Sequence, residues 1–149
     1  MKQAIHRVAA LLATACIAVF LISSITVELV GSFAAIAQVK NLIVCPGLFI
    51  LVPAIAITGA TGFSLAKNRS GRLIETKKKR MPIIGANGLL ILLPAAIYLD
   101  YLASNGTFGT TFYLVQGLEL LAGTINLSLM SLNIRDGLRL SGRLNRLKK

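Results

Sequence analysis

Four long runs without a charged residue constrain what this chain can fold into. They cover residues 8–27, 41–66, 81–99 and 101–134, and only Glu119 interrupts the last run. A helix needs about 20 predominantly apolar residues to cross the hydrocarbon core of a bilayer. The last run begins with a polar turn at 104–107, so each run supplies one span. The sequence therefore predicts an all-α integral membrane four-helix bundle, with spans at about 8–30, 42–66, 81–103 and 111–134.

Composition agrees with a single membrane domain. Of the 149 residues, 55% are apolar, and the mean hydropathy is +0.75. A water-soluble domain carries a larger share of polar residues than this. We therefore treat the whole chain, 1–149, as one membrane unit.

The sixteen Lys and Arg residues, against five Asp and Glu, predict how the spans are oriented. Fifteen of the sixteen lie before the first span, at 67–80, or after residue 134, and Lys40 is alone on the other side. Cytoplasmic connections of membrane proteins carry an excess of Lys and Arg. We expect both termini and the basic loop 67–80 in the cytoplasm, with connections 31–41 and 103–110 outside. The spans then form two antiparallel hairpins, 8–66 and 81–134.

The same basic residues predict contact with lipid headgroups. A Lys or Arg beside an anionic bilayer surface contributes about 1 kcal/mol to membrane attraction. The tail 135–149 also has a basic amphipathic pattern suited to lying on the inner leaflet. Because no aromatic residue is interleaved with these charges, we do not expect nucleic acid as a partner. The expected contacts with anionic lipid are Lys77, Lys78, Lys79, Arg80, Arg139, Arg143 and Arg146.

One polar line crosses the last span. Its members are spaced so that they return to one face of a helix: Gln116, Glu119, Gly123, Asn126 and Asn133. An acidic residue within a membrane span is costly and usually faces a bundle interior or a water-filled cavity. Glu119 is therefore the centre of the candidate site.

Depth in the membrane predicts which polar groups could meet. At the helical rise of 1.5 Å per residue, Glu119 lies about 12 Å inside the outer boundary. Ser23 and Ser24 lie about 9–10 Å and Tyr98 about 6–7 Å inside that boundary, so all could join Glu119. In the other half, Asn87 and Asn126 lie about 9 and 12 Å from the inner boundary and could pair. We interpret Glu28 as a charge at the outer interface.

Two interpretations of this polar line remain open. In the first, it is a seam between helices, in which Gly123 permits close approach and Asn126 bonds across. In the second, Glu119 binds a proton, a cation or a ligand. Burial of Glu119 against Leu and Ile would favour the seam, and Glu119→Gln should then leave stability unchanged or improved.

Proline positions predict local distortions of two spans. Pro53 should kink the second span, because a proline inside a helix removes a backbone donor. Pro82 stands at a first-turn position that proline tolerates, if the third span begins at Met81.

No residue pattern for enzymatic chemistry occurs. The sequence has no glycine-rich phosphate loop, no paired-cysteine metal motif and no His-Glu metal pair. Its one histidine, His6, is far along the chain from Cys45, so a cysteine nucleophile has no base. We expect no catalytic residue, no metal and no cofactor.

Residues 113–123 read Tyr-Leu-Val-Gln-Gly-Leu-Glu-Leu-Leu-Ala-Gly and continue through Asn126 to Asn133-Ile134-Arg135-Asp136-Gly137. With Lys-Lys-Lys-Arg-Met-Pro at 77–82, this chain resembles a family of small four-helix integral membrane proteins of bacteria. The resemblance covers most of the chain and implies a multi-pass protein of the bacterial inner membrane. It carries no assigned activity and transfers no functional residue.

Three functions follow as hypotheses. The first is a non-enzymatic accessory, assembly or helix-interaction protein, whose partner is a copy of itself or another membrane subunit. The second is a small proton- or cation-coupled transporter or channel that works through Glu119. The third is a binder of a lipid-soluble cofactor between the helices.

Overall fold

The computed structural model describes residues 1–67 and 71–140, and these ranges contain helices but no strand. A π-helical segment, Ile43–Leu48, joins the second helix to the third, and another, Gly88–Leu92, joins the fourth to the fifth. The α-helices are α1 (Lys2–Val30), α2 (Phe33–Leu42), α3 (Phe49–Ala66), α4 (Arg72–Asn87), α5 (Leu93–Ser104) and α6 (Thr110–Leu140).

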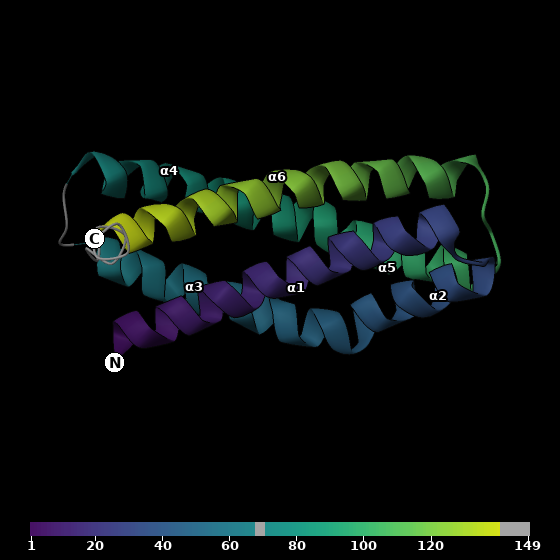
Figure 1. Cartoon of the computed structure of the whole chain (residues 1–149), viewed down its shortest axis with the longest axis horizontal. Coiled ribbons are helices and arrows are strands. Elements are labelled where there is room, and N and C mark those ends of the chain that lie inside the picture. Colours follow the sequence, from purple (N-terminus) through teal and green to yellow (C-terminus); the bar gives the residue numbers. More distant parts are fainter. Residues whose placement is uncertain (68–70, 141–149) are drawn as a thin grey trace.

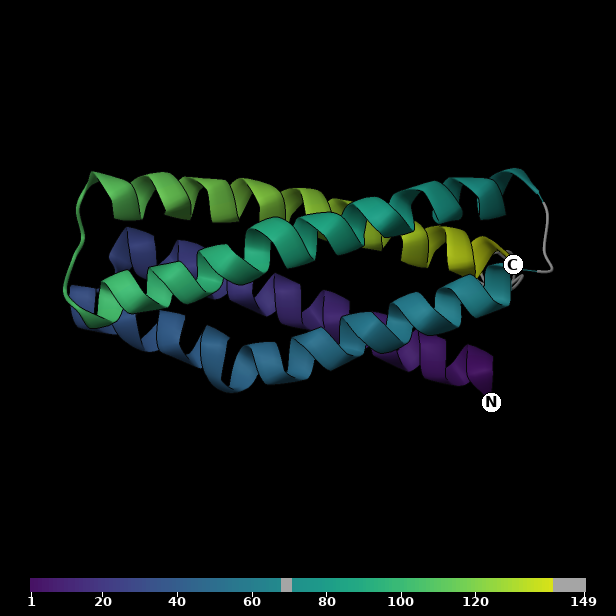
Figure 2. The same ribbon diagram turned by 180° about the vertical axis from the view of Figure 1, so that it is seen from behind.

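These elements form long rods that lie side by side along the long axis of the molecule (Figure 1). Within the described residues, four continuous helical stretches are long and apolar enough to cross a membrane: Lys2–Val30, Phe33–Ala66, Arg72–Ser104 and Thr110–Leu140. The start of α1 and the end of α6 lie at the same end of the bundle, as the views from both sides show (Figures 1 and 2). The expected all-helical bundle with four candidate spans is thus confirmed.

The connection after α1 is much shorter than the expected loop 31–41. Only Gly31 and Ser32 separate α1 from α2. The Ser32 hydroxyl accepts a hydrogen bond from the Ala35 backbone N–H at 3.3 Å, which caps the start of α2. A Cβ on Gly31 would lie 2.5 Å from the Val27 carbonyl oxygen, so this tight turn requires glycine. The second helical stretch therefore begins about nine residues earlier than the apolar pattern predicts.

The second stretch is interrupted before Pro46 rather than at Pro53. Cys45 has φ −134° and ψ 114°, outside the helical region. The residue before a proline is driven toward extended backbone because the proline ring crowds it. Pro53 lies inside α3.

The basic loop is also shorter than expected. Because α4 begins at Arg72, residues 72–80 are helical and Pro82 lies inside α4, not in a first turn. At the other end of the chain, α6 continues to Leu140, so the first part of the predicted tail is helix. Residues 141–149 lie outside the described residues.

Two clusters of buried side chains form the core. The first lies between α1, α3, α4 and α6, and the second joins α2, α5 and α6. Many large apolar side chains remain exposed on the outside of the bundle, which fits helices whose outer faces contact lipid. The first cluster consists of Ala13, Ile17, Leu51, Ala54, Ile84 and Met130, and the second of Ile36, Leu99, Leu102, Ala103 and Phe112.

Candidate functional site

A buried ion pair joins the two halves of the chain. The Lys40 ammonium on α2 lies 2.6 Å from Oε2 of Glu119 on α6. The Lys40 side chain is 0% exposed and that of Glu119 is 12% exposed. Lys40 also donates a hydrogen bond to the Ser24 hydroxyl on α1, at 3.1 Å. Glu119 is therefore held between three helices rather than facing lipid.

Glu28 and Gln116 complete this group. Gln116 Nε2 donates to Oε2 of Glu119 at 3.3 Å, from one turn earlier on the same helix. Glu28, one turn beyond Ser24 on α1, lies within electrostatic range of both Lys40 and Glu119. We call Ser24, Glu28, Lys40, Gln116 and Glu119 the Lys40 cluster. It places two carboxylates around one ammonium.

The Lys40 cluster has two polar atoms that are buried without a hydrogen-bond partner among the described residues. They are Oε1 of Glu28 and Oε1 of Gln116. Both are acceptors, whereas the Lys40 ammonium is already shared between Glu119 and Ser24. Glu28 is thus less interfacial than expected, because one of its oxygens has no contact with solvent. A proton on Glu28 would remove the excess negative charge from the cluster.

Aromatic packing holds α2 in the position that buries Lys40. The Phe33 ring at the start of α2 stacks on Phe108 with the ring centroids 4.4 Å apart. Phe108 in turn meets Phe112 of α6 edge to face at 5.1 Å. Such aromatic pairs add about 0.5–1.5 kcal/mol beyond the burial of their area. Through Phe108 they link the start of α2 to the start of α6.

The surroundings of the Lys40 cluster are apolar. A cavity of about 110 Å³ adjoins it, and Ser24 and Glu119 are the polar residues among its lining. The rest of the wall consists of glycine, alanine and large apolar side chains such as Ile17, Phe20 and Leu51. A buried water needs two to four polar partners, so walls of this kind do not favour a hydrated path.

A second polar contact on α6 lies toward its C-terminal half. Asn87 Nδ2 donates to Asn126 Oδ1 at 3.0 Å and to the Ala122 carbonyl at 2.8 Å. Asn126 is fully buried, and its Nδ2 donates to the Ile84 carbonyl at 3.3 Å. These bonds tie α4 to α6, as the depth of the two asparagines suggested. Both side-chain Nδ2 groups are engaged in these bonds.

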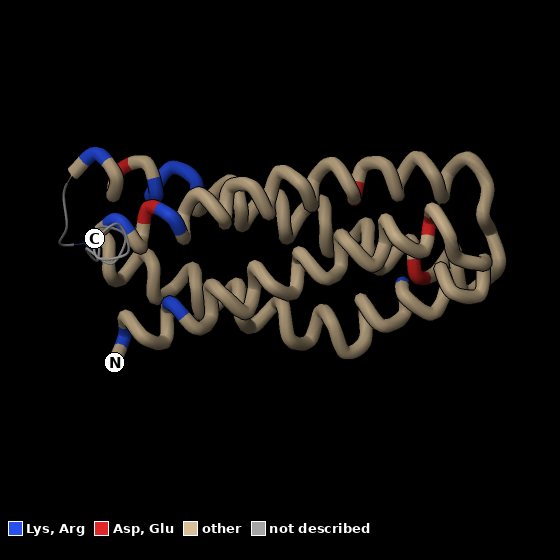
Figure 3. Tube along the Cα trace, viewed as in Figure 1, with Lys and Arg blue, Asp and Glu red and all other residues tan. Residues whose placement is uncertain are grey.

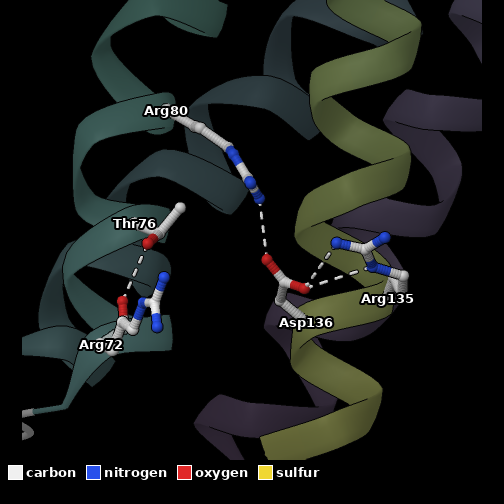
Figure 4. A network of polar contacts seen from close by, with 5 residues as sticks. All are labelled: Arg72, Thr76, Arg80, Arg135 and Asp136. Atoms are coloured by element: carbon white, nitrogen blue, oxygen red, sulfur yellow. Dashed lines mark hydrogen bonds and ion pairs between the residues drawn. The ribbon is translucent and has the colours of Figure 1, made fainter.

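A third contact lies near the end of α6. Asp136 is 2% exposed, and its Oδ2 accepts a hydrogen bond from Arg80 Nη1 at 2.8 Å. Its other oxygen accepts from the neighbouring Arg135, with Nε at 3.3 Å. Figure 4 shows Arg80 reaching from α4 toward Asp136, while Thr76 bonds back to the Arg72 carbonyl. Arg80, for which contact with lipid stays a prediction, is the ion-pair partner of Asp136.

The remaining predicted site residues do not join the Lys40 cluster. The Ser23 hydroxyl donates to the Phe20 carbonyl of its own helix at 3.1 Å. Tyr98 is 43% exposed, and its ring lies 6.5 Å from that of Tyr101. The expectation that Ser23 and Tyr98 meet Glu119 was therefore wrong.

Sequence reasoning missed Lys40, which it placed in an outer connection. The signal that could have identified Lys40 was its isolation. A single lysine on the side of the membrane that otherwise lacks basic residues suggests pairing with an acidic side chain. Glu119 is that acidic partner, because a carboxylate inside a span usually pairs with another polar or charged group.

The basic residues expected to contact lipid lie in different settings. Lys77 lines a large cavity described below, and Lys78 lies 3.4 Å from Glu75 on the surface of α4. Lys79 and Arg139 are exposed. Arg143 and Arg146 lie outside the described residues.

No cluster of His, Cys, Asp and Glu suited to a metal ion occurs in residues 1–67 and 71–140. Comparison with known protein families, curated protein sequences and solved structures finds no match for the chain. The function must therefore be argued from the geometry alone.

Proposed function

We propose that the protein is a multi-pass protein of the bacterial inner membrane, with both termini in the cytoplasm and two antiparallel hairpins. The distribution of charge supports this orientation. Lys and Arg gather at the end of the bundle that holds the start of α1 and the end of α6, whereas the opposite end is almost free of them (Figure 3). The positive-inside rule places the basic end in the cytoplasm.

Within that orientation, the protein acts without enzymatic chemistry, as an accessory or assembly protein that presents fixed helices to a partner. The observation that carries this proposal is that α6 has a polar contact with another helix at each of three levels. Glu119 contacts α2, and Asn126 and Asp136 contact α4. Each pair uses its polar groups to position helices, which leaves the apolar outer faces for lipid or for the helices of another subunit.

Purification in a mild detergent tests this proposal. We expect a stoichiometric second membrane protein, or a homo-oligomer, to elute with the chain. Cys45 is exposed and supplies a probe in intact membranes. A thiol cross-linker should give one discrete larger product, and Cys45→Ser should abolish it. A clean monomer in detergent, with no cross-linked product in the membrane, would contradict the proposal.

A second function, proton- or cation-coupled transport through Glu119, is favoured by one specific observation. Glu28 lies beside the Lys40–Glu119 pair with a buried oxygen that has no partner among the described residues. Ionisable groups inside a membrane often mark ion pathways. Because the adjoining cavity is apolar, we place this function second.

Proteoliposomes with a pH-sensitive dye inside distinguish the two functions. Transport predicts a proton flux, driven by an imposed potential, that Glu28→Gln abolishes while the fold persists. Asp100→Asn is the matched control, because Asp100 lies outside the Lys40 cluster and bonds only Ser104. Flux equal to that of empty liposomes would exclude proton transport, and the same assay with a sodium-sensitive dye addresses a cation.

A further inference from the structure

A second cavity lies at the basic end of the bundle, far from the Lys40 cluster. Its volume is about 720 Å³, and α1, α3, α4 and α6 line it. Sites for small molecules commonly enclose about 300–1,000 Å³. Most of the lining is apolar: Ile84 and Met130 are buried, whereas Leu11 and Phe63 are exposed, so the cavity opens on the outside of the bundle.

The charged residues that line this cavity all have the same sign. Arg7, Lys77 and Lys78 belong to the lining, together with His6, and no Asp or Glu does. Within the part of the chain that the structure describes, no salt bridge joins Arg7 or Lys77 to a carboxylate. The nearby Arg80 is different, because Asp136 neutralises it. Asp136 also lies within electrostatic range of Lys77. An anion entering the cavity would therefore meet Arg7 and Lys77 as cations that no salt bridge in the described residues holds.

A polar group without a partner lies beside these charges. Asn133 lines the cavity, and its Oδ1 is buried without a hydrogen-bond partner among the described residues. Asn133 lies one turn before Gly137, where an added Cβ would be 3.2 Å from the Lys77 ammonium nitrogen. An occupant that satisfies both groups carries an anion for Lys77 and a hydroxyl that donates to Asn133.

We propose that this cavity binds one phospholipid with an anionic phosphate and a hydroxyl-bearing headgroup. The acyl chain lies between the apolar walls, the phosphate lies near Arg7 and Lys77, and the headgroup hydroxyl donates to Asn133. Apolar walls below a cationic rim match such a molecule and do not match a soluble anion. The basic tail 141–149 is a poor alternative occupant, because Arg143, Arg146, Lys148 and Lys149 repel the rim. The inference goes beyond the proposed function and holds whatever partner the helices contact.

Native mass spectrometry of the delipidated full chain tests the proposal with phosphatidylglycerol and phosphatidylcholine of identical acyl chains. We expect one phosphatidylglycerol per chain at low lipid, with phosphatidylcholine bound at least tenfold more weakly. Excess inorganic phosphate should not displace the lipid. Displacement by phosphate alone would show a site for a free anion, and absence of any adduct would show that the cavity is filled otherwise. Either result would overturn the proposal.

Two charge variants test the rim. Lys77→Gln removes a cation that lines the cavity, whereas Lys79→Gln removes an exposed cation of the same helix that does not. We expect phosphatidylglycerol to bind about fivefold more weakly to Lys77→Gln and unchanged to Lys79→Gln. Equal weakening in both variants would mean that the lipid is attracted by the basic surface in general, and this would contradict binding in the cavity.

Two glycine variants test the acyl chain. Gly59 lines the cavity, Gly117 does not, and an added Cβ at either position meets nothing within 4 Å. Leucine is a better helix former than glycine, so neither Gly59→Leu nor Gly117→Leu should destabilise its helix. We expect Gly59→Leu to lose at least tenfold in lipid affinity and Gly117→Leu to bind as the parent does. Undiminished binding by Gly59→Leu, with a thermal melt like that of the parent, would refute the placement of the acyl chain.

Discussion

Removing either partner of the Lys40–Glu119 pair should destabilise the protein strongly. Among the described residues, Lys40→Met leaves the Glu119 carboxylate with Gln116 as its side-chain donor. Glu119→Leu leaves the fully buried ammonium with the Ser24 hydroxyl and the electrostatic attraction of Glu28. Breaking a buried ion pair from one side costs about 3–5 kcal/mol. The expectation from sequence that Glu119→Gln leaves stability unchanged or improved did not include Lys40.

The double variant Lys40→Met with Glu119→Leu should recover most of the loss. It removes both charges and replaces them with apolar side chains, which for buried ion pairs is often neutral or stabilising by about 1–4 kcal/mol. In a protein of this size, about 1 kcal/mol shifts the melting temperature by about 2–4 °C. Each single variant should therefore melt about 6–20 °C below the parent, and the double variant close to the parent.

Heating in detergent, followed by size-exclusion chromatography of the remaining monodisperse fraction, gives these melting temperatures. Lys79→Met is the control, since it removes an exposed lysine and such changes stay within about 0.5 kcal/mol. A double variant that loses the sum of both single losses would mean that the two side chains do not interact. That result would refute the structural role assigned to the pair.

Three further predictions concern the remaining contacts and the orientation. Asn126→Leu should cost about 1–3 kcal/mol, because it removes the bonds that Asn126 makes with Asn87 and with the Ile84 carbonyl of α4, and the same melting assay measures the loss. Asp136→Asn should lower the melting temperature by removing the charge that faces Arg80, while Asp136→Glu should recover part of the loss. In a chain without its two native cysteines, Lys79→Cys should react with an impermeant thiol reagent only after the membrane is opened. Labelling of this cysteine in sealed cells would contradict the predicted orientation.

Depth along a span was predictable from the sequence, but rotation around the helix axis was not. Ser23 and Ser24 lie at nearly the same depth, yet successive residues point about 100° apart on a helix. Ser24 is 2% exposed and reaches Lys40, whereas Ser23 bonds its own helix. Asn87 and Asn126 form a hydrogen bond because the two residues lie at a similar level along their helices and face each other across the interface. Tyr98 was expected at a depth near that of Glu119, but its side chain is 43% exposed and stacks on Tyr101.

The ends of the helices were the least predictable part of the fold. The apolar pattern stops at Lys40 and at Arg80, because charges define its limits, whereas the helices continue to Phe33 and Arg72. A helix can carry a charge in a span once another helix supplies the counter-charge. That pairing is a tertiary property, and no local pattern in the sequence contains it.

The separation of Lys40 and Glu119 along the chain has a consequence for synthesis. The two residues are 79 positions apart, and the carboxylate on α6 is synthesised after Lys40. Until α6 enters the bilayer, the first half of the protein holds an ammonium in lipid without the partner that it has in the finished bundle, a state that costs several kcal/mol. Burial of Lys40 is thus coupled to the insertion of α6.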